Sequence, residues 1–322
     1  MRALVVGGAG YVGSAVVRAL LHSGWDVAVL DALYTGRREN LPEIVPFYRN
    51  DGGIIGAVED VLKSAPFDLA ISAIALGGPI RSRKFPLHYY HNNFSAHFYL
   101  LRTLLERRIK KFLLLSDLSV YGGAVRCPIG PDTEKRPDTA LGRSLCAVEN
   151  FLADLTESDG MDYAVVRFGT VGGALPLGPA GPVLPDGARR FLSAAFAVAL
   201  GKEPVLNIFG AEFPTTDGTA LRDPLHVADV ADGIEKAVGD LMRRSGGREF
   251  LLASGRPITL LQWLQAIKAV TQREIPTERT DPVPFDAPAL YGDPADGASA
   301  LGWRAQRDIG QIVEDEWRLL RK

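Results

Sequence analysis

The stretch ALVVGGAGYVGSAVVRALLHSGWDVAVLD, residues 3–31, decides the fold. An apolar run leads into a turn with glycines at positions 7, 8, 10 and 13, a helical pattern follows, and a second apolar run ends on Asp31. The glycines keep the turn tight and let its backbone approach a pyrophosphate, while the start of the helix offers free N–H groups and the positive end of its dipole. A strand, glycine turn, helix, strand and acid in this order predict a dinucleotide site.

Two kinds of residue are predicted to hold the cofactor. The turn contributes Gly7, Gly10, Tyr11, Val12 and Gly13. Asp31, about 20 residues beyond the turn, is placed to accept hydrogen bonds from the adenosine ribose; the alternative is a solvated loop acid. Arg37 and Arg38 could meet the 2′-phosphate of NADP, but the Asp31 carboxylate would repel that phosphate. We therefore expect the cofactor to be NAD.

Composition narrows the class of protein. The chain has 322 residues, 47% of them apolar, which is enough for one large domain or two smaller ones. The net charge is −2 with both signs scattered, so nothing indicates a nucleic-acid or anionic-membrane surface. Cys127 and Cys146 are too few for a disulfide framework or a metal set and fit a reducing cytoplasm. The chain enters its first strand at once and lacks an apolar run of membrane length, so we expect neither a signal peptide nor a membrane span.

Alternation of apolar strands and helical patterns through the first half predicts a parallel sheet covered on both faces, the doubly wound Rossmann α/β class. The expected strands beyond the opening unit are 45–48, 67–73, 111–115 and 163–168, and the long helices are 87–107 and 141–156. After a Gly- and Pro-rich loop at 172–187, further elements are expected at 188–200, 205–209, 227–242 and 309–320. The predicted nucleotide-binding domain is 1–170 with returning segments near 205–245, and the smaller substrate-binding lobe is 171–204 with 246–322.

Five short motifs carry a resemblance that covers almost the whole chain. They are GGAGYVGS (7–14), YHNN (90–93), SVYG (119–122), IFG with PTTDGTALRDPLHVAD (208–210 and 214–229), and LGW (301–303). Together they resemble the extended short-chain dehydrogenase/reductases, specifically the UDP-glucose 4-epimerase branch of the NAD-dependent epimerase/dehydratases. The resemblance implies an NAD cofactor, a nucleotide-sugar or other anionic small-molecule substrate, and a homodimer paired through the helices near 87–107 and 141–156.

Further cofactor residues are implied by this resemblance. Asp51, at the end of the third strand, matches an adenine-contacting acid, or is simply a turn acid. Ala73 and Ala75 match positions that line the cofactor passage, or belong to the core. Asn93 starts a helix beside the cofactor.

The family's proton-transfer residues are replaced in this chain. The family uses a Ser and a Tyr-x-x-x-Lys, in which tyrosinate takes a sugar hydroxyl proton while hydride goes to NAD. The corresponding positions here are Asp117, Leu141 and Leu145, and none of the 9 tyrosines is followed by a lysine four residues later. Asp117 could act as a base whose pKa burial would raise, or could cap a turn. Tyr121, in the SVYG motif, is expected to be a substrate-side or structural residue.

The resemblance also implies the substrate contacts. Thr170 and Arg190 stand where the family has asparagines that meet a sugar diphosphate, and Arg222 matches its diphosphate-binding arginine. Asp286 matches a second family acid; a second family arginine falls near Val283, so Arg279 or Arg190 would supply that charge. The predicted function is an atypical NAD-binding epimerase/dehydratase-like enzyme acting on a sugar or sugar nucleotide. The alternatives are a dinucleotide-binding partner or sensor without redox turnover, and non-redox chemistry on the same scaffold.

Overall fold

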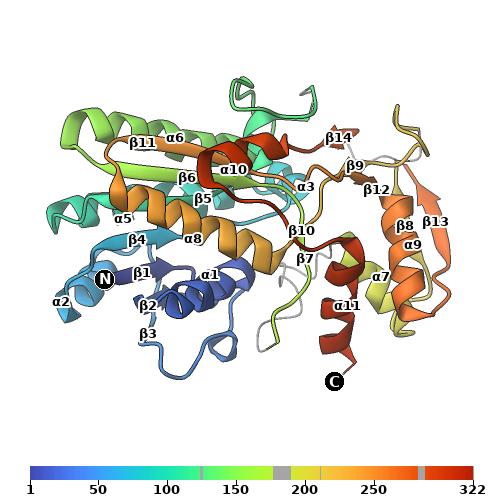
Figure 1. The fold of residues 1–322 in the computed structure, drawn as a ribbon, viewed down its shortest axis with the longest axis horizontal. Helices are drawn as coiled ribbons and strands as arrows, with labels where there is room; N and C mark the ends of the chain where they lie inside the picture. Colours follow the sequence, from blue (N-terminus) through green and yellow to red (C-terminus); the bar gives the residue numbers. More distant parts are fainter. Residues whose placement is uncertain (124–125, 177–189, 211, 282–286, 322) are drawn as a thin grey trace.

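A parallel sheet forms the centre of the protein (Figure 1). The computed structural model describes residues 1–123, 126–176, 190–210, 212–281 and 287–321. Within them, seven strands pair in the order β11-β6-β5-β4-β1-β2-β3. Their bounds are β1 Arg2–Val6, β2 Asp26–Asp31, β3 Phe47–Arg49, β4 Leu69–Ser72, β5 Lys111–Asp117, β6 Asp162–Phe168 and β11 Gly247–Leu252. Because β1 lies between β2 and β4, the chain reverses its direction of winding beside β1, where doubly wound sheets bind their ligands.

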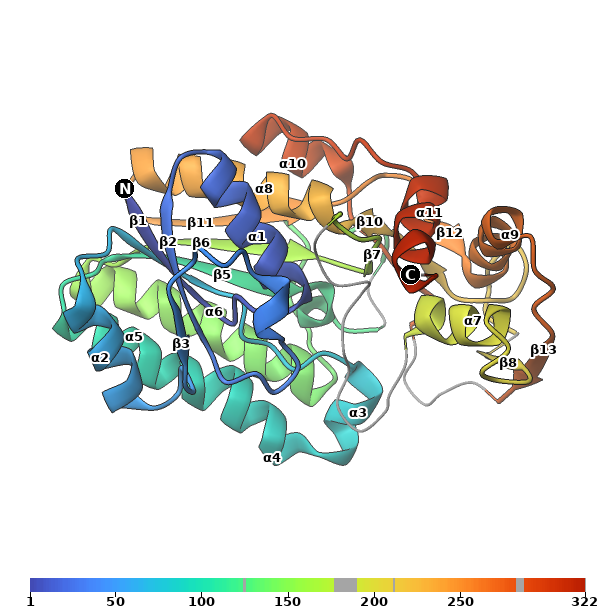
Figure 2. The ribbon, with the colours of Figure 1, turned by 90° about the horizontal axis from the view of Figure 1, so that it is seen from below.

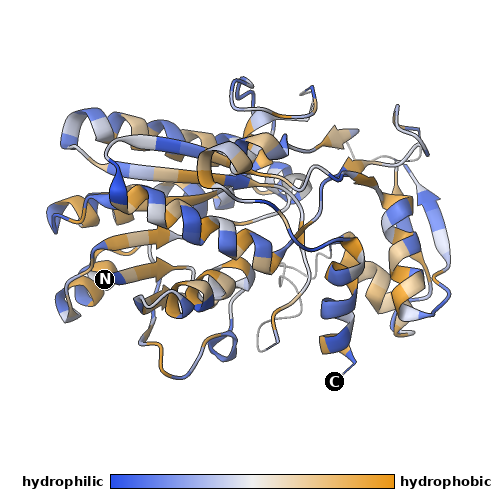
Figure 3. Ribbon diagram, viewed as in Figure 1, coloured by the Kyte–Doolittle hydropathy of each residue, from blue (hydrophilic) through white to orange (hydrophobic). Residues whose placement is uncertain are grey.

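Helices cover both faces of this sheet (Figure 2). Alternate side chains of β1 enter different cores: Val5 packs with α1 (Tyr11–His22) and α8 (Val227–Arg243), whereas Leu4 packs with α2, α5 and α6. This follows from the two-residue period of a strand, and it explains why the strand is apolar throughout. The other helices of these layers are α2 Ile55–Ser64, α5 Ala96–Glu106, α6 Ala140–Asp159 and α10 Pro294–Leu301. Hydrophobic and hydrophilic residues alternate along these helices (Figure 3), as helices with one buried face require.

A smaller lobe has its own apolar core beyond the carboxyl ends of the strands. Trp317 stacks on Phe196 at a centroid distance of 5.4 Å, joining the last helix to α7. Its helices are α7 Phe191–Ala199, α9 Leu260–Thr271 and α11 Ile309–Leu320, and its strands are β8 Leu206–Phe209, β9 Leu221–Arg222, β12 Ile258–Thr259, β13 Thr277–Thr280 and β14 Ala289–Leu290. Two-residue strands β7 (Val171–Gly172) and β10 (Leu225–His226) pair where the chain passes between the lobes.

Short helices complete the fold. The expected helix over 87–107 is divided into α4 (Pro86–Tyr89), a π-helix (Tyr90–Ser95) and α5. The remaining pieces are α3 Pro79–Lys84 and the 3-10 helices Arg38–Asn40 and Leu118–Tyr121. No helix in the described ranges is both long and apolar enough to cross a membrane.

The doubly wound α/β class is confirmed, but two strands lie in a different part from the one expected. The sequence predicts the smaller lobe for 246–322, whereas β11 forms an edge of the central sheet, where its buried residues Phe250 to Leu252 pair with β6. It predicts the nucleotide-binding domain for segments near 205–245, whereas β8 pairs with β13 of the smaller lobe. Each of these strands belongs to the lobe that contains its pairing partner. That partner is far away in the sequence, so the composition of the segment does not predict it. Most of the expected 172–187 loop lies outside the described residues.

His97, on α5, should make stability depend on pH. Its Nδ1 lies 2.5 Å from the Asn93 carbonyl and so carries the proton, leaving Nε2 to accept from the Ser72 hydroxyl at 2.7 Å. Burial lowers the pKa of His97 from 6.5 to about 4. Because the pKa is lower in the folded state, the contribution of neutral His97 to the free energy of unfolding is fully present above pH 6.5. It is lost as the pH falls towards 4, by about 3 kcal/mol in total.

Urea unfolding of the wild type and of His97→Gln at a series of pH values between 4 and 7 checks this. The free energy of unfolding of His97→Gln should fall less on acidification than that of the wild type. His22→Gln, at an exposed position, should behave like the wild type. An equal acid loss in His97→Gln and the wild type would contradict the assignment.

Candidate functional site

The glycine turn connects β1 to α1 through unusually close backbone contacts. Gly7 has φ +81°, and a Cβ there would lie 2.8 Å from the Ala73 carbonyl group. A Cβ on Gly13 would lie 2.3 Å from the Gly7 carbonyl oxygen. Only glycine allows α1 to start this close to the turn, which leaves the backbone open to a bulky anionic ligand at the helix N-terminus.

Asp31 binds the same turn from the end of β2. Its Oδ2 accepts from the N–H of Ala9 at 2.8 Å and its Oδ1 from the N–H of Leu33 at 2.7 Å. Burial raises the pKa of Asp31, and these two hydrogen bonds oppose the shift. The carboxylate is therefore held at the edge of the turn rather than solvated in a loop. Arg38 donates to four carbonyl oxygens between Leu41 and Val45, so its guanidinium is committed to the local loop.

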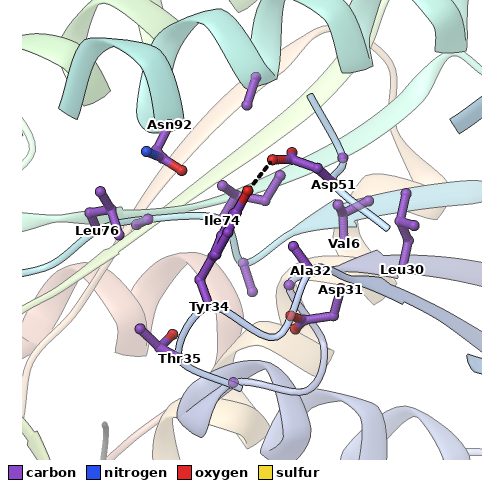
Figure 4. Close-up of a pocket in the computed structure, with 16 residues that line it drawn as sticks. Val6, Leu30, Asp31, Ala32, Tyr34, Thr35, Asp51, Ile74, Leu76 and Asn92 are labelled. Atoms are coloured by element: carbon purple, nitrogen blue, oxygen red, sulfur yellow. Dashed lines mark hydrogen bonds between the residues drawn. The ribbon is translucent and has the colours of Figure 1, made fainter. Parts of the chain in front are cut away.

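A pocket brings the turn and the strand ends together (Figure 4). Asp51 accepts from the Gly53 N–H at 2.7 Å and from the Tyr34 hydroxyl at 3.0 Å. Tyr34 thus lines the pocket and points to Asp51, a feature that we did not predict, although an aromatic residue three positions after Asp31 is a usable signal. Of the predicted cofactor residues, the lining includes Gly7, Gly10, Asp31, Asp51, Ala73 and Ala75.

The remaining predicted cofactor residues surround the pocket without lining it. Asn93 is fully buried; its amide oxygen accepts from the Leu76 N–H at 2.9 Å and its Nδ2 donates to Ser144 Oγ at 3.2 Å. It therefore positions the 73–76 segment, while its neighbour Asn92 lines the pocket. Val12 packs against the α1 side of the core. The Tyr11 hydroxyl donates to the Gly173 carbonyl at 2.6 Å, towards the smaller lobe.

The expected proton-transfer corner is apolar. Leu141 is 3% exposed and Leu145 is fully buried, and both pack with Leu118 and Tyr121 in one cluster. Asp117 caps the 3-10 helix that follows β5, since its Oδ1 accepts from the Ser119 N–H at 2.8 Å. Burial raises the pKa of Asp117, against these local hydrogen bonds. The structure thus shows the capping role; a catalytic role for Asp117 stays a prediction.

A buried ionic network holds this corner in place. Glu149 of α6 is fully buried and accepts from Ser116 Oγ at 2.6 Å and from Arg167 Nη2 at 2.7 Å. Arg167 Nη1 also donates to the Tyr121 hydroxyl at 2.9 Å, and Lys135 bonds to Glu149 at 3.0 Å. Tyr121 therefore occupies a structural position. The network joins α6, β5, β6 and the 3-10 helix.

The predicted substrate residues lie near the connections between the lobes and on the smaller lobe. The Thr170 carbonyl accepts from the Leu225 N–H at 2.9 Å, and Arg222 Nη1 donates to the Ala287 carbonyl at 2.8 Å. Arg279 is exposed on β13 of the smaller lobe. Asp286 and Val283 lie outside the described residues.

Arg190, at the start of α7, belongs to a cluster that we did not predict. Its Nη2 is ion-paired with Glu316 of α11, its Nη1 donates to the Val171 carbonyl at 3.1 Å, and its guanidinium lies 5.8 Å from the centre of the Tyr11 ring. Burial raises the pKa of Glu316 to about 7, although Arg190 opposes the shift. The cluster connects the first turn of α1 to the smaller lobe. No spacing in the sequence indicates a contact between residues 126 positions apart.

Comparison with known proteins identifies the scaffold. The model of the NAD dependent epimerase/dehydratase family matches residues 3–253. The chain belongs to this family. The UDP-glucose 4-epimerase of Bacillus subtilis is 33% identical over 99% of this chain and 96% of its own length. That of Azospirillum brasilense is 32% identical over 95% of this chain and 88% of its own length.

Solved structures of family members have the same fold throughout. UDP-glucose 4-epimerase from Stenotrophomonas maltophila, with bound NAD and formylated UDP-arabinopyranose, superposes with a TM-score of 0.93 at 27% identity, covering 100% of this chain and 98% of that one. The enzyme from Brucella ovis, in complex with NAD, has a TM-score of 0.90 at 28% identity, covering 98% of this chain and 96% of that one. Within the described residues, no cluster of His, Cys, Asp and Glu could hold a metal ion.

The close contact at Gly13 makes a stability prediction. Gly13→Ala would force its Cβ against the Gly7 carbonyl and should lower the free energy of unfolding by about 1–3 kcal/mol. Gly56→Ala is the matched control, because a Cβ on this helical glycine of α2 meets nothing within 4 Å and alanine favours a helix by up to about 1 kcal/mol. Urea unfolding measures the free energy of unfolding of both variants. If Gly13→Ala is as stable as Gly56→Ala, the turn can relax to admit the Cβ and the prediction is wrong.

Proposed function

We propose that this protein binds NAD and a nucleotide sugar in the passage between its lobes, without using a Tyr-Lys pair for chemistry. The pocket beside the glycine turn supports NAD, because Gly7 and Gly13 leave room for a pyrophosphate and the Asp31 and Asp51 carboxylates can accept from ribose and adenine. NAD supplies a hydride acceptor when bound. The family members from Stenotrophomonas maltophila and Brucella ovis, solved with NAD, support the same ligand.

The nucleotide sugar is proposed from the residues that face the passage. Arg222 is the cation expected to meet its diphosphate, with Thr170 as a further proposed contact; the resemblance adds Asp286, which lies outside the described residues. Arg190 carries a second positive charge, but the ion pair with Glu316 neutralises much of it. We therefore propose that the cofactor binds to the central sheet and that the sugar nucleotide binds to the smaller lobe.

Asp117 is the residue proposed to accept a proton from a substrate hydroxyl. It stands at the carboxyl end of β5, where ligands approach a doubly wound sheet. Its pKa is raised by burial, which brings a carboxylate closer to the range of an effective base. If the protein is an enzyme, we therefore propose that Asp117 accepts the proton, and not the residues at positions 141 and 145.

Binding without redox turnover is the second candidate function. The observation that favours it is the burial of Leu141 and Leu145, since leucine transfers no proton and these two side chains face an apolar cluster. In this version the protein responds to a bound dinucleotide as a partner or sensor.

A homodimer is proposed from the surface of the helices around the π-helix. Leu87 is 82% exposed, and Tyr90, Phe98 and Tyr99 are each more than one-third exposed. Phe98 stacks on Phe151 of α6 at 5.7 Å, so the aromatic surface extends over both helices. Apolar side chains that gather on one face mark a contact with another chain, and a second copy with the same face gives a closed twofold pair.

Asp117→Asn tests the catalytic proposal. Asparagine keeps an oxygen for the Ser119 N–H but cannot take a proton, so interconversion of a nucleotide sugar should fall by about 100-fold or more. The assay incubates purified protein and NAD with UDP-glucose, UDP-galactose and their N-acetyl forms and separates the products by chromatography. Asp293→Asn, which alters a comparable cap on α10, should leave the rate unchanged. Absence of turnover in the wild type across the panel would leave the binding function as the one that stands.

Phe98→Lys tests the dimer. Phe98 contacts both Tyr99 and Phe151, and a charge there should convert the protein to a monomer, because burying a lysine between two apolar surfaces is unfavourable. Light scattering coupled to size exclusion measures the mass. Ile44→Lys, on an exposed isoleucine of another surface, is the control and should remain dimeric. A wild-type mass equal to that of one chain would remove the proposal.

A further inference from the structure

The pocket beside the glycine turn ends at Leu76. This side chain lines the pocket and also packs against the apolar cluster beyond it, so it forms the boundary between the two. We call that cluster the closed corner; its buried members are Tyr89, Leu118, Val120, Tyr121, Ile129, Ala140, Leu141, Leu145 and Leu251. Within the described part of the chain, none of these residues lines the pocket.

The closed corner lies where the second half of a dinucleotide is directed. A dinucleotide crosses a doubly wound sheet at its switch point, with adenosine on one side and the second nucleoside over the other strands. Here the adenosine side is β1, β2 and β3, and the other side is β4, β5 and β6. Leu118 follows β5 directly, and Leu141 and Leu145 of α6 cover the same end. Side chains that solvent cannot reach make no contact with a ligand unless the structure rearranges.

The two halves of the site differ in the polar partners that they offer. The adenosine half has the Asp31 and Asp51 carboxylates, and the N-terminus of α1 follows it. The second half of NAD carries a carboxamide and two ribose hydroxyls, which lose hydrogen bonds to water and need replacements. Leucine offers none, and the Tyr121 hydroxyl, which accepts from Arg167, is buried inside the closed corner. The Asp117 carboxylate caps the 3-10 helix through the Ser119 N–H and is the proposed acceptor for a substrate hydroxyl rather than for the nicotinamide half.

We propose that this site recognises the ADP moiety of its ligand and that the nicotinamide half of NAD adds little to affinity. The class of ligand is then ADP-containing compounds, of which NAD is one. This inference rests on the proposed dinucleotide site and refines it. Contacts beside the glycine turn supply the binding free energy, and the part of the ligand beyond Leu76 adds little.

A ligand series measured by isothermal titration calorimetry on the wild-type protein tests the inference. NAD, ADP-ribose and ADP share the ADP moiety, and their dissociation constants should agree within about threefold, because the proposal allows the second ribose and the nicotinamide less than one good hydrogen bond. Nicotinamide mononucleotide should bind at least about 100-fold more weakly than ADP-ribose, since it lacks the part that the pocket holds. GDP should bind more weakly than ADP, because Asp51 can accept from the adenine amino group and guanine presents an oxygen there.

The outcomes separate this inference from the proposed function. NAD binding more than about tenfold tighter than ADP-ribose or ADP would overturn the inference while leaving an NAD site in place. If neither NAD nor ADP-ribose binds, the proposed dinucleotide site itself is wrong. Asp51→Asn serves as the matched variant, because it should weaken NAD and ADP-ribose by the same factor and leave their ratio unchanged.

A substitution in the closed corner gives a second measurement. Leu141→Tyr with Leu145→Lys adds a hydroxyl and an ammonium where the nicotinamide ribose would lie. In the folded variant, the ratio of NAD to ADP affinity, and likewise that of ADP-ribose to ADP affinity, should rise by about tenfold or more, because NAD and ADP-ribose carry that ribose, while ADP affinity stays unchanged. An unchanged ratio in a folded variant would contradict the assignment of this corner to the nicotinamide half. Should the variant fail to fold, the wild-type series decides alone.

Discussion

The buried pair between Glu149 and Arg167 is the constraint on which the site depends. It is the point where α6, β5, β6 and the 3-10 helix after β5 meet, because Ser116 and Tyr121 bond to the same two side chains. A buried ion pair has little tolerance for loss of one partner, since the other would be left charged without compensation. The pair therefore holds α6 at a set distance from the strand ends, whichever residues the helix presents at positions 141 and 145.

The residues proposed for recognition and those proposed for chemistry lie on different elements. The glycine turn, Asp31 and Asp51 belong to β1, β2 and β3, whereas Asp117, Leu141 and Leu145 belong to β5 and α6. The two groups share the sheet but have no common hydrogen bond among those described. A change of residues on α6 would therefore leave the geometry of the glycine turn intact. The main cores lie on the faces of the sheet, so the scaffold does not depend on the residues at 141 and 145.

Local patterns in the sequence were enough for the class of fold and for the adenosine side of the site. The glycine turn and Asp31 are close in sequence, so their spacing reports their geometry directly. Asn93 shows the limit: its motif places it near the cofactor, but its amide is used by Leu76 and Ser144, which only tertiary packing brings to it. The exchange of β8 and β11 between the lobes and the pairing of Arg190 with Glu316 depend on contacts across long stretches of chain, for which composition and periodicity carry no signal.

The ion pair between Arg190 and Glu316 also has a consequence for the order of folding. The glycine turn is synthesised long before α11, yet the Tyr11 ring at its edge packs beside a guanidinium whose partner lies on α11. During translation the central strands and α1 can assemble while Arg190 still lacks its carboxylate. The passage between the lobes therefore gains its final shape only after α11 has left the ribosome, and a ligand that needs both lobes cannot assist the earlier steps of folding.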